Sequence, residues 1–175
     1  LDLINLATVK TAKPAAGTFL LMADITVEAC RETIAWILEA NLAEEENRPD
    51  VLTLFINSPG GDLYSATALI DVMRGSSIPI QTIGLGQIAS AGLLIFMAGH
   101  KGMRVLTENT SIMSHRFSSG VGGKSHELLA AHKEFNMIGE RMTELYMRFT
   151  GLPEKTVTKY LLPAEDVFLT PKEAL

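Results

Sequence analysis

The sequence is poor in cysteine, in aromatic residues and in long apolar runs. Its single cysteine, Cys30, cannot form an intrachain disulfide and has no partner at the spacing of a metal site, so we expect a core residue. The apolar stretch 88–98 is too short to span a bilayer. Residues 1–10 lack the basic lead and unbroken apolar run of a signal peptide. These absences predict a soluble protein of a reducing compartment.

Charge of one sign is not concentrated in any segment. The 175 residues carry 15 basic and 20 acidic side chains, and the basic ones are scattered singly. Nucleic-acid-binding domains usually show a basic patch or stripe, so the sequence disfavours that function. An apolar content of 47% is enough to bury a core, and the length fits one domain.

The sequence does contain an alternation of strand and helix patterns, which predicts an α/β domain with mostly parallel pairing. The continuously apolar run 51–56 is typical of a strand buried on both faces. Helices are expected after a cap at Thr26 or Asp24 and after the turn 57–62. The expected strands are 18–23, 51–56, 78–85, 103–106 and 111–113, and a compact helix is expected over 90–98. The predicted buried faces of the first two helices are Cys30, Ile34, Ile37 and Leu38, and Ala66, Leu69, Ile70 and Met73.

A long helix is predicted in the last third of the chain. Seven apolar residues spaced alternately by three and four form a heptad seam on a helix of roughly 28 residues, or about 42 Å. We expect it to project past its own core, with its seam buried by another subunit; the alternative is that it packs along its own sheet. Gly151 and Pro153 end it. The seam residues are Leu128, Ala131, Phe135, Ile138, Met142, Leu145 and Phe149.

Two segments could surround an acyl-transfer site. In the turn 57–62, Gly60 and Gly61 let backbone N–H groups face a pocket and a developing oxyanion, although a plain strand-to-helix turn also favours Pro-Gly-Gly. Ser90 opens a predicted helix among small neighbours, so it is either a nucleophile or only a helix cap. Ile88 and Gly92 flank it, which does not match the Gly-x-Ser-x-Gly elbow and disfavours an α/β-hydrolase.

A histidine and a carboxylate could complete such a site. His115 ends a short apolar strand and is the best candidate for a general base, with a structural role as the alternative. The carboxylate that orients it could be Asp166, at an expected strand start, or Asp62 or Asp71. Asp62 is also well placed to cap the following helix. Composition does not choose among the three.

Taken together, these motifs resemble the Clp protease proteolytic subunit family. The likeness runs in order, with ordinary spacings, from about Thr18 to the end of the sequence. Five motifs in register are far more specific than any one of them. The segments that carry the resemblance are Phe55–Gly61, Gly86–Gly92, Ala98–Arg104, Ile112–His115 and Glu165–Thr170 followed by Glu173-Ala174.

The resemblance implies a fold and a set of site residues. The fold is the ββα superhelix shared with the crotonases, with a projecting handle helix. Residues 1–175 would form one peptidase domain, with an axial segment over 1–17, a head over 18–121 and 152–175, and the handle over 122–151. It further implies the following roles: Ser90 as nucleophile, His115 as base, Asp166 as orienting acid, the N–H groups of Gly61 and Ala91 as the oxyanion hole, and Gly60, Ser118, Gly120, Val121 and Gly122 as substrate-binding residues.

The resemblance also implies partners. The expected assembly is two stacked seven-membered rings of this chain, fed with polypeptides by an ATP-driven AAA+ unfoldase, and the chemistry needs no cofactor or metal. Ala91 replaces the family's usual methionine, and Arg116-Phe117 replaces Gln-Pro. The alternatives are a catalytically silent or regulatory ring subunit, a crotonase-like acyl-CoA enzyme, and a relative of the signal peptide peptidases.

Overall fold

A six-stranded sheet forms the centre of the part of the chain that the computed structural model describes, residues 17–174. Its strand order is β1-β2-β3-β5-β6, and β4 pairs with β3 off this path. All pairs are parallel except β5 with β6, so the predicted mostly parallel sheet is confirmed. The strands are β1 (Thr18–Leu21), β2 (Leu52–Ser58), β3 (Ile80–Ala89), β4 (Arg104–Leu106), β5 (Ser111–Ser114) and β6 (Val167–Leu169).

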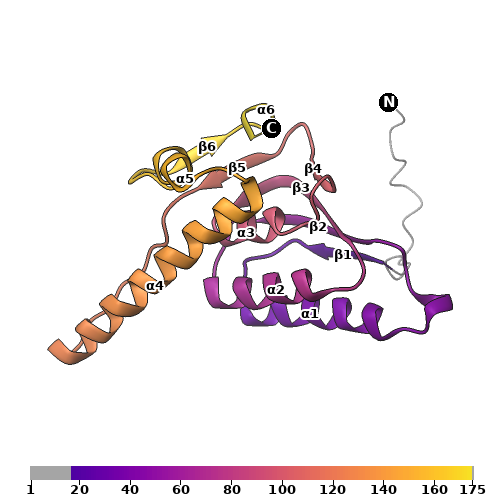
Figure 1. Cartoon of the computed structure of the whole chain (residues 1–175), viewed down its shortest axis with the longest axis horizontal. Coiled ribbons are helices and arrows are strands. Elements are labelled where there is room, and N and C mark those ends of the chain that lie inside the picture. The colour runs from indigo at the N-terminus through magenta and orange to yellow at the C-terminus, as the bar shows by residue number, and fades with distance from the viewer. Residues whose placement is uncertain (1–16, 175) are drawn as a thin grey trace.

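The helices α1 and α2 lie side by side on one side of this sheet (Figure 1). Each begins at a side-chain cap: the Thr26 hydroxyl accepts from the Ala29 N–H at 3.1 Å, and the Asp62 carboxylate accepts from the Ser65 N–H at 2.8 Å. Of the two predicted caps for the first helix, Thr26 is therefore the one used. The helices are α1 (Val27–Leu42), the short 3₁₀ helix η2 (Glu45–Asn47), α2 (Leu63–Gly75), α3 (Ala91–Met97), α4 (Ser125–Thr150), α5 (Glu154–Tyr160) and α6 (Pro171–Ala174).

The sheet is covered unequally on its two faces. Along β2, Leu52, Leu54 and Ile56 are buried, whereas Thr53 and Phe55 between them are only half-buried. The prediction of a strand buried on both faces is therefore wrong, because α1 and α2 both pack against the same face (Figure 1). A parallel strand can be apolar throughout while only alternate residues face covering helices.

The prediction for the buried face of α1 is also wrong at one residue. Cys30 and Ile37 are buried as expected, but Leu38 is 47% exposed and Thr33 takes its place in the core. The Thr33 hydroxyl donates to the Ala29 carbonyl at 2.8 Å, so its burial leaves no unpaired donor. Hydrophobicity alone could not indicate this exchange.

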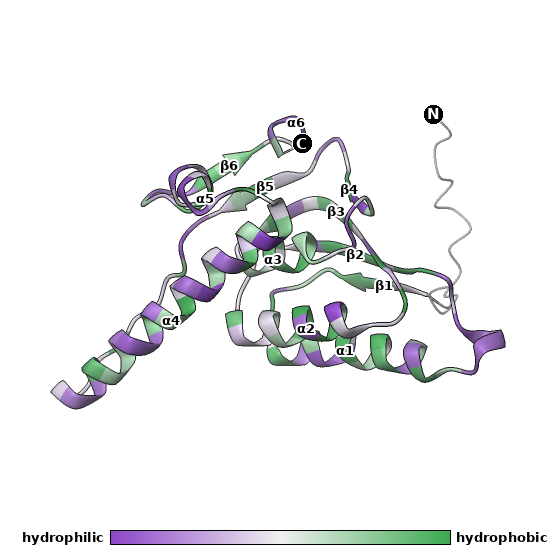
Figure 2. Cartoon of the chain, viewed as in Figure 1, coloured by the Kyte–Doolittle hydropathy of each residue, from purple (hydrophilic) through white to green (hydrophobic). Residues whose placement is uncertain are grey.

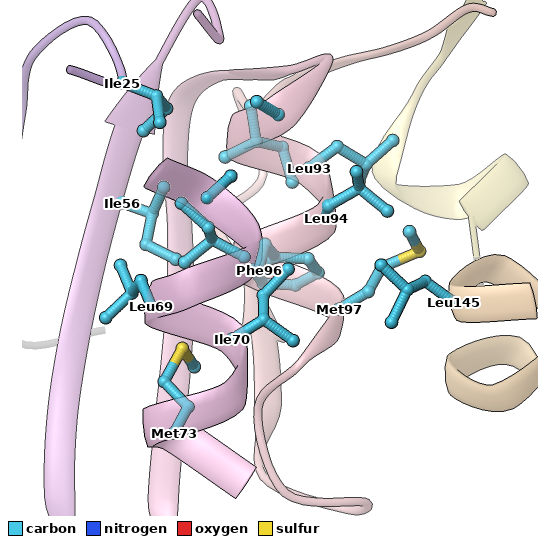
Figure 3. Packing of buried hydrophobic residues seen from close by; sticks show 14 of the residues in the cluster. Ile25, Ile56, Leu69, Ile70, Met73, Leu93, Leu94, Phe96, Met97 and Leu145 are labelled. Atoms are coloured by element: carbon cyan, nitrogen blue, oxygen red, sulfur yellow. The ribbon is translucent and has the colours of Figure 1, made fainter. Parts of the chain in front are cut away.

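The core lies between the sheet and helices α1, α2, α3 and α4. Figure 3 shows Ile70 of α2 beside Phe96 of α3, whereas Leu69 and Met73 lie on the other side of α2. All four residues predicted for the buried face of α2 are buried. Every residue of the seven-residue helix α3 is buried as well, so the point where α3 begins is fixed by packing on all sides.

Helix α4 is divided into a packed half and a projecting half. Its 26 residues extend about 39 Å. Ile138, Met142 and Leu145 are buried, whereas Leu128 and Leu129 near its start are 41% and 72% exposed. The first half extends away from the sheet and carries alternating polar and apolar residues (Figures 1 and 2). The projection is confirmed for the first half of the helix. The second half packs on the protein's own core, so for Ile138, Met142 and Leu145 the expected burial by another subunit is wrong.

Three further predictions concern the start of the chain, the end of α4 and membrane-spanning helices. The expected axial segment, residues 1–17, lies outside the described residues except for Gly17. Gly151 ends α4 as predicted, in the left-handed region at φ 76°, and its N–H donates to the Met147 carbonyl at 2.8 Å. None of the helices in residues 17–174 is both long enough and apolar enough to cross a membrane.

Candidate active site

Strand register brings Ser90, His115 and Asp166 to one edge of the sheet. Ser90 follows β3, His115 follows β5, and Asp166 precedes β6. Because β3 and β5 are parallel neighbours, their ends meet at the same edge; because β5 and β6 are antiparallel, the end of one lies beside the start of the other. The nearest paired residues are Ala89 with Met113 and Ser114 with Val167.

The three side chains form a continuous chain of contacts. His115 Nε2 lies 2.8 Å from Ser90 Oγ, which is hydrogen-bonding distance. On its other side, His115 Nδ1 lies 3.5 Å from Asp166 Oδ1. The imidazole side chain is 22% exposed and the carboxylate 58% exposed. A serine hydroxyl, an imidazole and a carboxylate in this order can activate the hydroxyl oxygen as a nucleophile.

Ser90 has an unusual backbone. Its φ of 52° makes it the only non-glycine residue with positive φ among residues 17–174. Such a conformation costs energy and is retained only where its surroundings hold it. Here the Ser90 N–H donates to the Met113 carbonyl at 3.0 Å. Ser90 occupies the N-cap position of α3, yet its side chain makes no capping hydrogen bond. Its hydroxyl is directed to His115 instead, which does not fit a plain capping role.

The glycine turn presses its backbone against Ser90. Gly60 has φ 100°, and a Cβ added there would lie 2.6 Å from the Ser90 Cβ and 3.2 Å from the Ala91 N. A Cβ on Gly61, with φ 147°, would lie 2.3 Å from the Ile25 carbonyl oxygen. Only glycine fits both positions. The Gly60 backbone thus lies against Ser90 and Ala91, and the Gly61 backbone lies against Ile25.

The backbone N–H groups of Gly60 and Ala91 differ in whether they already have an acceptor. The Gly60 N–H donates to Ser58 Oγ at 3.1 Å, so it is occupied within the turn. Ala91 is the first residue of α3, where an N–H has no intrahelical acceptor. This arrangement favours Ala91 over Gly60 as a donor toward an oxygen atom bound at Ser90, and the role of the Gly61 N–H stays a prediction.

The structure separates Asp166 from the other candidate carboxylates. Asp62 accepts the Ser65 N–H and caps α2, and Asp71 lies on the exposed side of α2. Of the other histidines, His100 accepts the Ile80 N–H at 3.2 Å, and His126 and His132 lie exposed on α4. Within residues 17–174, no three His, Cys, Asp or Glu side chains form a group that could hold a metal ion.

A cavity of about 230 Å³ opens beside Gly61, between α2 and α4. One wall comes from buried residues of the α4 seam, and another from Phe117 and Ser118 after β5. The ring of Phe117 packs on that of Phe135 with centroids 5.4 Å apart, which holds this wall against α4. The apolar residues that line the cavity are Leu63, Phe117, Ile138, Met142 and Leu145, and the other lining residues are Gly61, Asp62, Tyr64, Thr67, Ser118, Ser119 and Arg141.

Most of these lining residues were missed from sequence. Ile138, Met142 and Leu145 were interpreted only as a packing seam, and the one available signal was their common face with Phe135. Of the predicted substrate-binding residues, Ser118 lines the cavity and Gly60 contacts Ser90. Gly120, Val121 and Gly122 lie outside the cavity lining, in an exposed segment without regular structure.

Tyr64 joins the cavity to the projecting half of α4. Its hydroxyl donates to the Glu134 carboxylate, and this hydrogen bond, followed by slight burial and the negative charge of Glu134, raises the pKa of Tyr64. The contact ties the start of α2 to α4 beside the cavity, whose lining includes Tyr64. A change in the position of α4 would therefore also change the cavity.

Comparison with known proteins gives one family. The family model described as Clp protease matches residues 13–175. A curated relative from Deinococcus radiodurans, named ATP-dependent Clp protease proteolytic subunit, is 33% identical over 134 residues. The alignment covers 77% of this chain but only 65% of that relative, so the chain spans slightly less than two thirds of the relative's length.

Proposed function

We propose that this chain, which belongs to the Clp protease family, is a serine peptidase subunit that cleaves peptide bonds of polypeptides. In this proposal Ser90 is the nucleophile, His115 the general base and Asp166 the carboxylate that orients His115. The observation that carries it is the pair of contacts at His115: 2.8 Å from Nε2 to Ser90 Oγ and 3.5 Å from Nδ1 to Asp166 Oδ1.

The reaction proceeds by acyl transfer. His115 takes the proton of Ser90 as Oγ attacks the peptide carbonyl, and the oxyanion is bound by the N–H groups of Gly61 and Ala91. His115 then returns the proton to the leaving amine, which departs and leaves an ester on Ser90. Water, deprotonated by the same imidazole, hydrolyses the ester and regenerates the hydroxyl. Asp166 holds the imidazole in the tautomer that presents Nε2 to Ser90.

Substrate is held in an extended conformation along the site. The cavity beside Gly61 accepts the side chain that precedes the cleaved bond, and its lining from α4 favours an apolar one. Gly60, Ser118, Gly120, Val121 and Gly122 offer backbone groups to the substrate chain. A methyl group placed on Gly120 or Gly122 would meet no other atom within 4 Å, so a substrate strand has room to approach this segment closely.

Assembly with copies of itself belongs to the same proposal. Leu128 and Leu129 in the projecting half of α4 are exposed apolar residues, as expected of a helix covered by another subunit. The subunit would act within two stacked heptameric rings in the cytoplasm or an organelle stroma or matrix, with an AAA+ unfoldase supplying polypeptides. The whole sequence, 1–175, would form one peptidase domain.

A fluorophosphonate probe tests the proposal, because it reacts only with an activated serine. We expect labelling of the native chain, and a decrease of more than about 10⁴-fold in labelling and in peptide hydrolysis for Ser90→Ala. Ser77→Ala, an exposed serine after α2, is the matched control and should label fully. Size-exclusion chromatography of each variant reports assembly.

An unlabelled but assembled native chain would refute autonomous peptidase activity. It would favour the second candidate, a silent or regulatory subunit of a mixed ring. Labelling that persists in Ser90→Ala would refute the assignment of the nucleophile.

A further inference from the structure

The residues on both sides of His115 bind the segment that carries Asp166. Before His115, the Ser114 hydroxyl donates to the Leu161 carbonyl at 2.5 Å. After it, Arg116 Nε donates to the Leu162 carbonyl at 2.8 Å. Two successive carbonyls are thus held by the two immediate neighbours of the base, and the chain reaches Asp166 four residues later.

The start of this segment is also attached to α5 and the core. The N–H groups of Leu161 and Leu162 both donate to the Val157 carbonyl at 2.9 Å, and Leu162 is 4% exposed. Helix α5 ends at Tyr160, and residues 161–166 belong to no helix or strand. β6 that follows has three residues and pairs only with β5, at the edge of the sheet. The Asp166 side chain is 58% exposed. Its position relative to His115 therefore depends on how the segment 161–166 is attached to α5 and to β5.

The first of these two attachments, the hydrogen bond from Ser114 to Leu161, is buried in the core. The Tyr146 hydroxyl of α4 lies 2.7 Å from Ser114 Oγ, and because Ser114 donates to Leu161, Tyr146 is the donor to Ser114. Tyr146 and Ser114 are fully buried. Removing either one would disturb the packing of α4 on β5, so a loss of activity in such variants would not identify the cause.

The other attachment lies at the surface and can be removed alone. Arg116 is an exposed residue, and the Nε bond fixes its planar guanidinium in one orientation over the segment. We infer that Arg116 is a positioning residue, which keeps the segment 161–166 in the register that places Asp166 opposite His115. The inference rests on the proposed peptidase function and assigns no contact between Arg116 and substrate.

The decisive variant is Arg116→Gln, assayed with a fluorogenic peptide and with the fluorophosphonate probe. We expect kcat and the labelling rate to fall about 10-fold, because a displaced orienting group impairs the base, with KM changed less than about 2-fold. Arg116→Lys keeps the charge but not the Nε donor, and should lose kcat to a similar extent. It serves as the second variant if Arg116→Gln does not fold.

The matched control is Arg48→Gln. Arg48 Nη2 donates to the backbone carbonyls of Asn41 and Ala43, both at 3.1 Å, at the end of α1. Like Arg116, Arg48 is therefore a surface arginine whose side chain donates to backbone carbonyls, but it lies far from His115 in the sequence. We expect its kcat and KM to equal those of the native chain.

A double-mutant cycle separates positioning from general stabilisation. If Arg116 acts through Asp166, Arg116→Gln should change kcat less than about 2-fold when Asp166 is already Asn. The same 10-fold loss in both backgrounds, or a native kcat for Arg116→Gln, would overturn the inference while leaving the peptidase function intact. A native chain that does not label overturns the proposed function, and this inference with it.

Discussion

Ser90 and Asp166 bind the same imidazole from two very different surroundings. Ser90 precedes α3, whose seven residues are all buried, and Gly60 contacts it directly. Asp166 precedes β6, a three-residue edge strand in which Phe168 is 65% exposed. The contact of His115 is 2.8 Å on the serine side and 3.5 Å on the aspartate side.

This difference shows that the two halves of the site are held by different forces. Close packing fixes the serine side, so a change there must also disturb the core. A few hydrogen bonds at a sheet edge hold the aspartate side, so it can move at little cost in stability. Activity should therefore be lost together with stability on one side, and almost separately from it on the other.

The largest effect is expected from Gly60→Ala on the serine side. The new methyl group would lie 2.6 Å from the Ser90 Cβ at a φ of 100°, so we expect a loss of about 2 kcal/mol in unfolding free energy. Peptide hydrolysis should fall at least about 10³-fold, because the oxyanion donors and Ser90 are both displaced. Gly75→Ala, where a methyl group meets nothing within 4 Å, is the control. Equal activity of the two variants would contradict the packing argument.

A smaller loss is expected from Asp166→Asn on the other side. We expect hydrolysis to fall about 10²-fold, less than the ~10⁴-fold supplied by a buried triad aspartate, because this carboxylate is 58% exposed. Thermal and urea unfolding should be unchanged within about 0.5 kcal/mol. A loss of more than about 2 kcal/mol of unfolding free energy would mean that Asp166 contributes to the folding core, which would contradict the contrast between the two sides of the site.

The difference in stability between α3 and β6 can be measured without an activity assay. Leu94→Ala in α3 removes a side chain with 0% exposure and should cost about 2–4 kcal/mol of unfolding free energy. Phe168→Ala in β6 should cost less than about 0.5 kcal/mol, because its ring is largely exposed. Urea titration of both variants is the measurement. Similar costs would show that the edge strand is as firmly held as α3.

A pH-dependent effect is expected from Tyr146, whose hydroxyl donates to Ser114. Burial raises the pKa of Tyr146 from an ordinary value of 10.0 to about 12. Below pH 10 the phenol is protonated in both folded and unfolded chains; above it the unfolded chain ionises first, so stability is lost as the pH approaches 12. We expect the stability advantage of the native chain over Tyr146→Phe to shrink by about 1 kcal/mol between about pH 9 and pH 11. A constant advantage would mean that the phenol ionises equally easily in both states.

The parts of the fold that could be predicted from sequence are those set by local patterns. The strand and helix order, the cap at Asp62 and the end of α4 at Gly151 each depend on a few adjacent residues, and the structure has them; for the first helix the sequence left Thr26 and Asp24 open, and the structure uses Thr26. The exposure of Leu38 was not predicted, because the edge of the α1 contact depends on where α2 and the sheet lie. The same holds for the half-buried Phe55 of β2.

For the site, the sequence by itself determined the candidates: a serine among small residues, a histidine at a strand end and two glycines after a buried strand. It left Ser90 as cap or nucleophile, and left three aspartates open. Only the tertiary structure decided which groups meet, since the pairing of β5 with β6 places Asp166 at His115 and leaves Asp62 on α2. The cavity between α2 and α4 was likewise decided only there. Local patterns reflect forces between near neighbours, whereas strand register and helix packing join residues far apart in the chain through contacts that no short segment encodes.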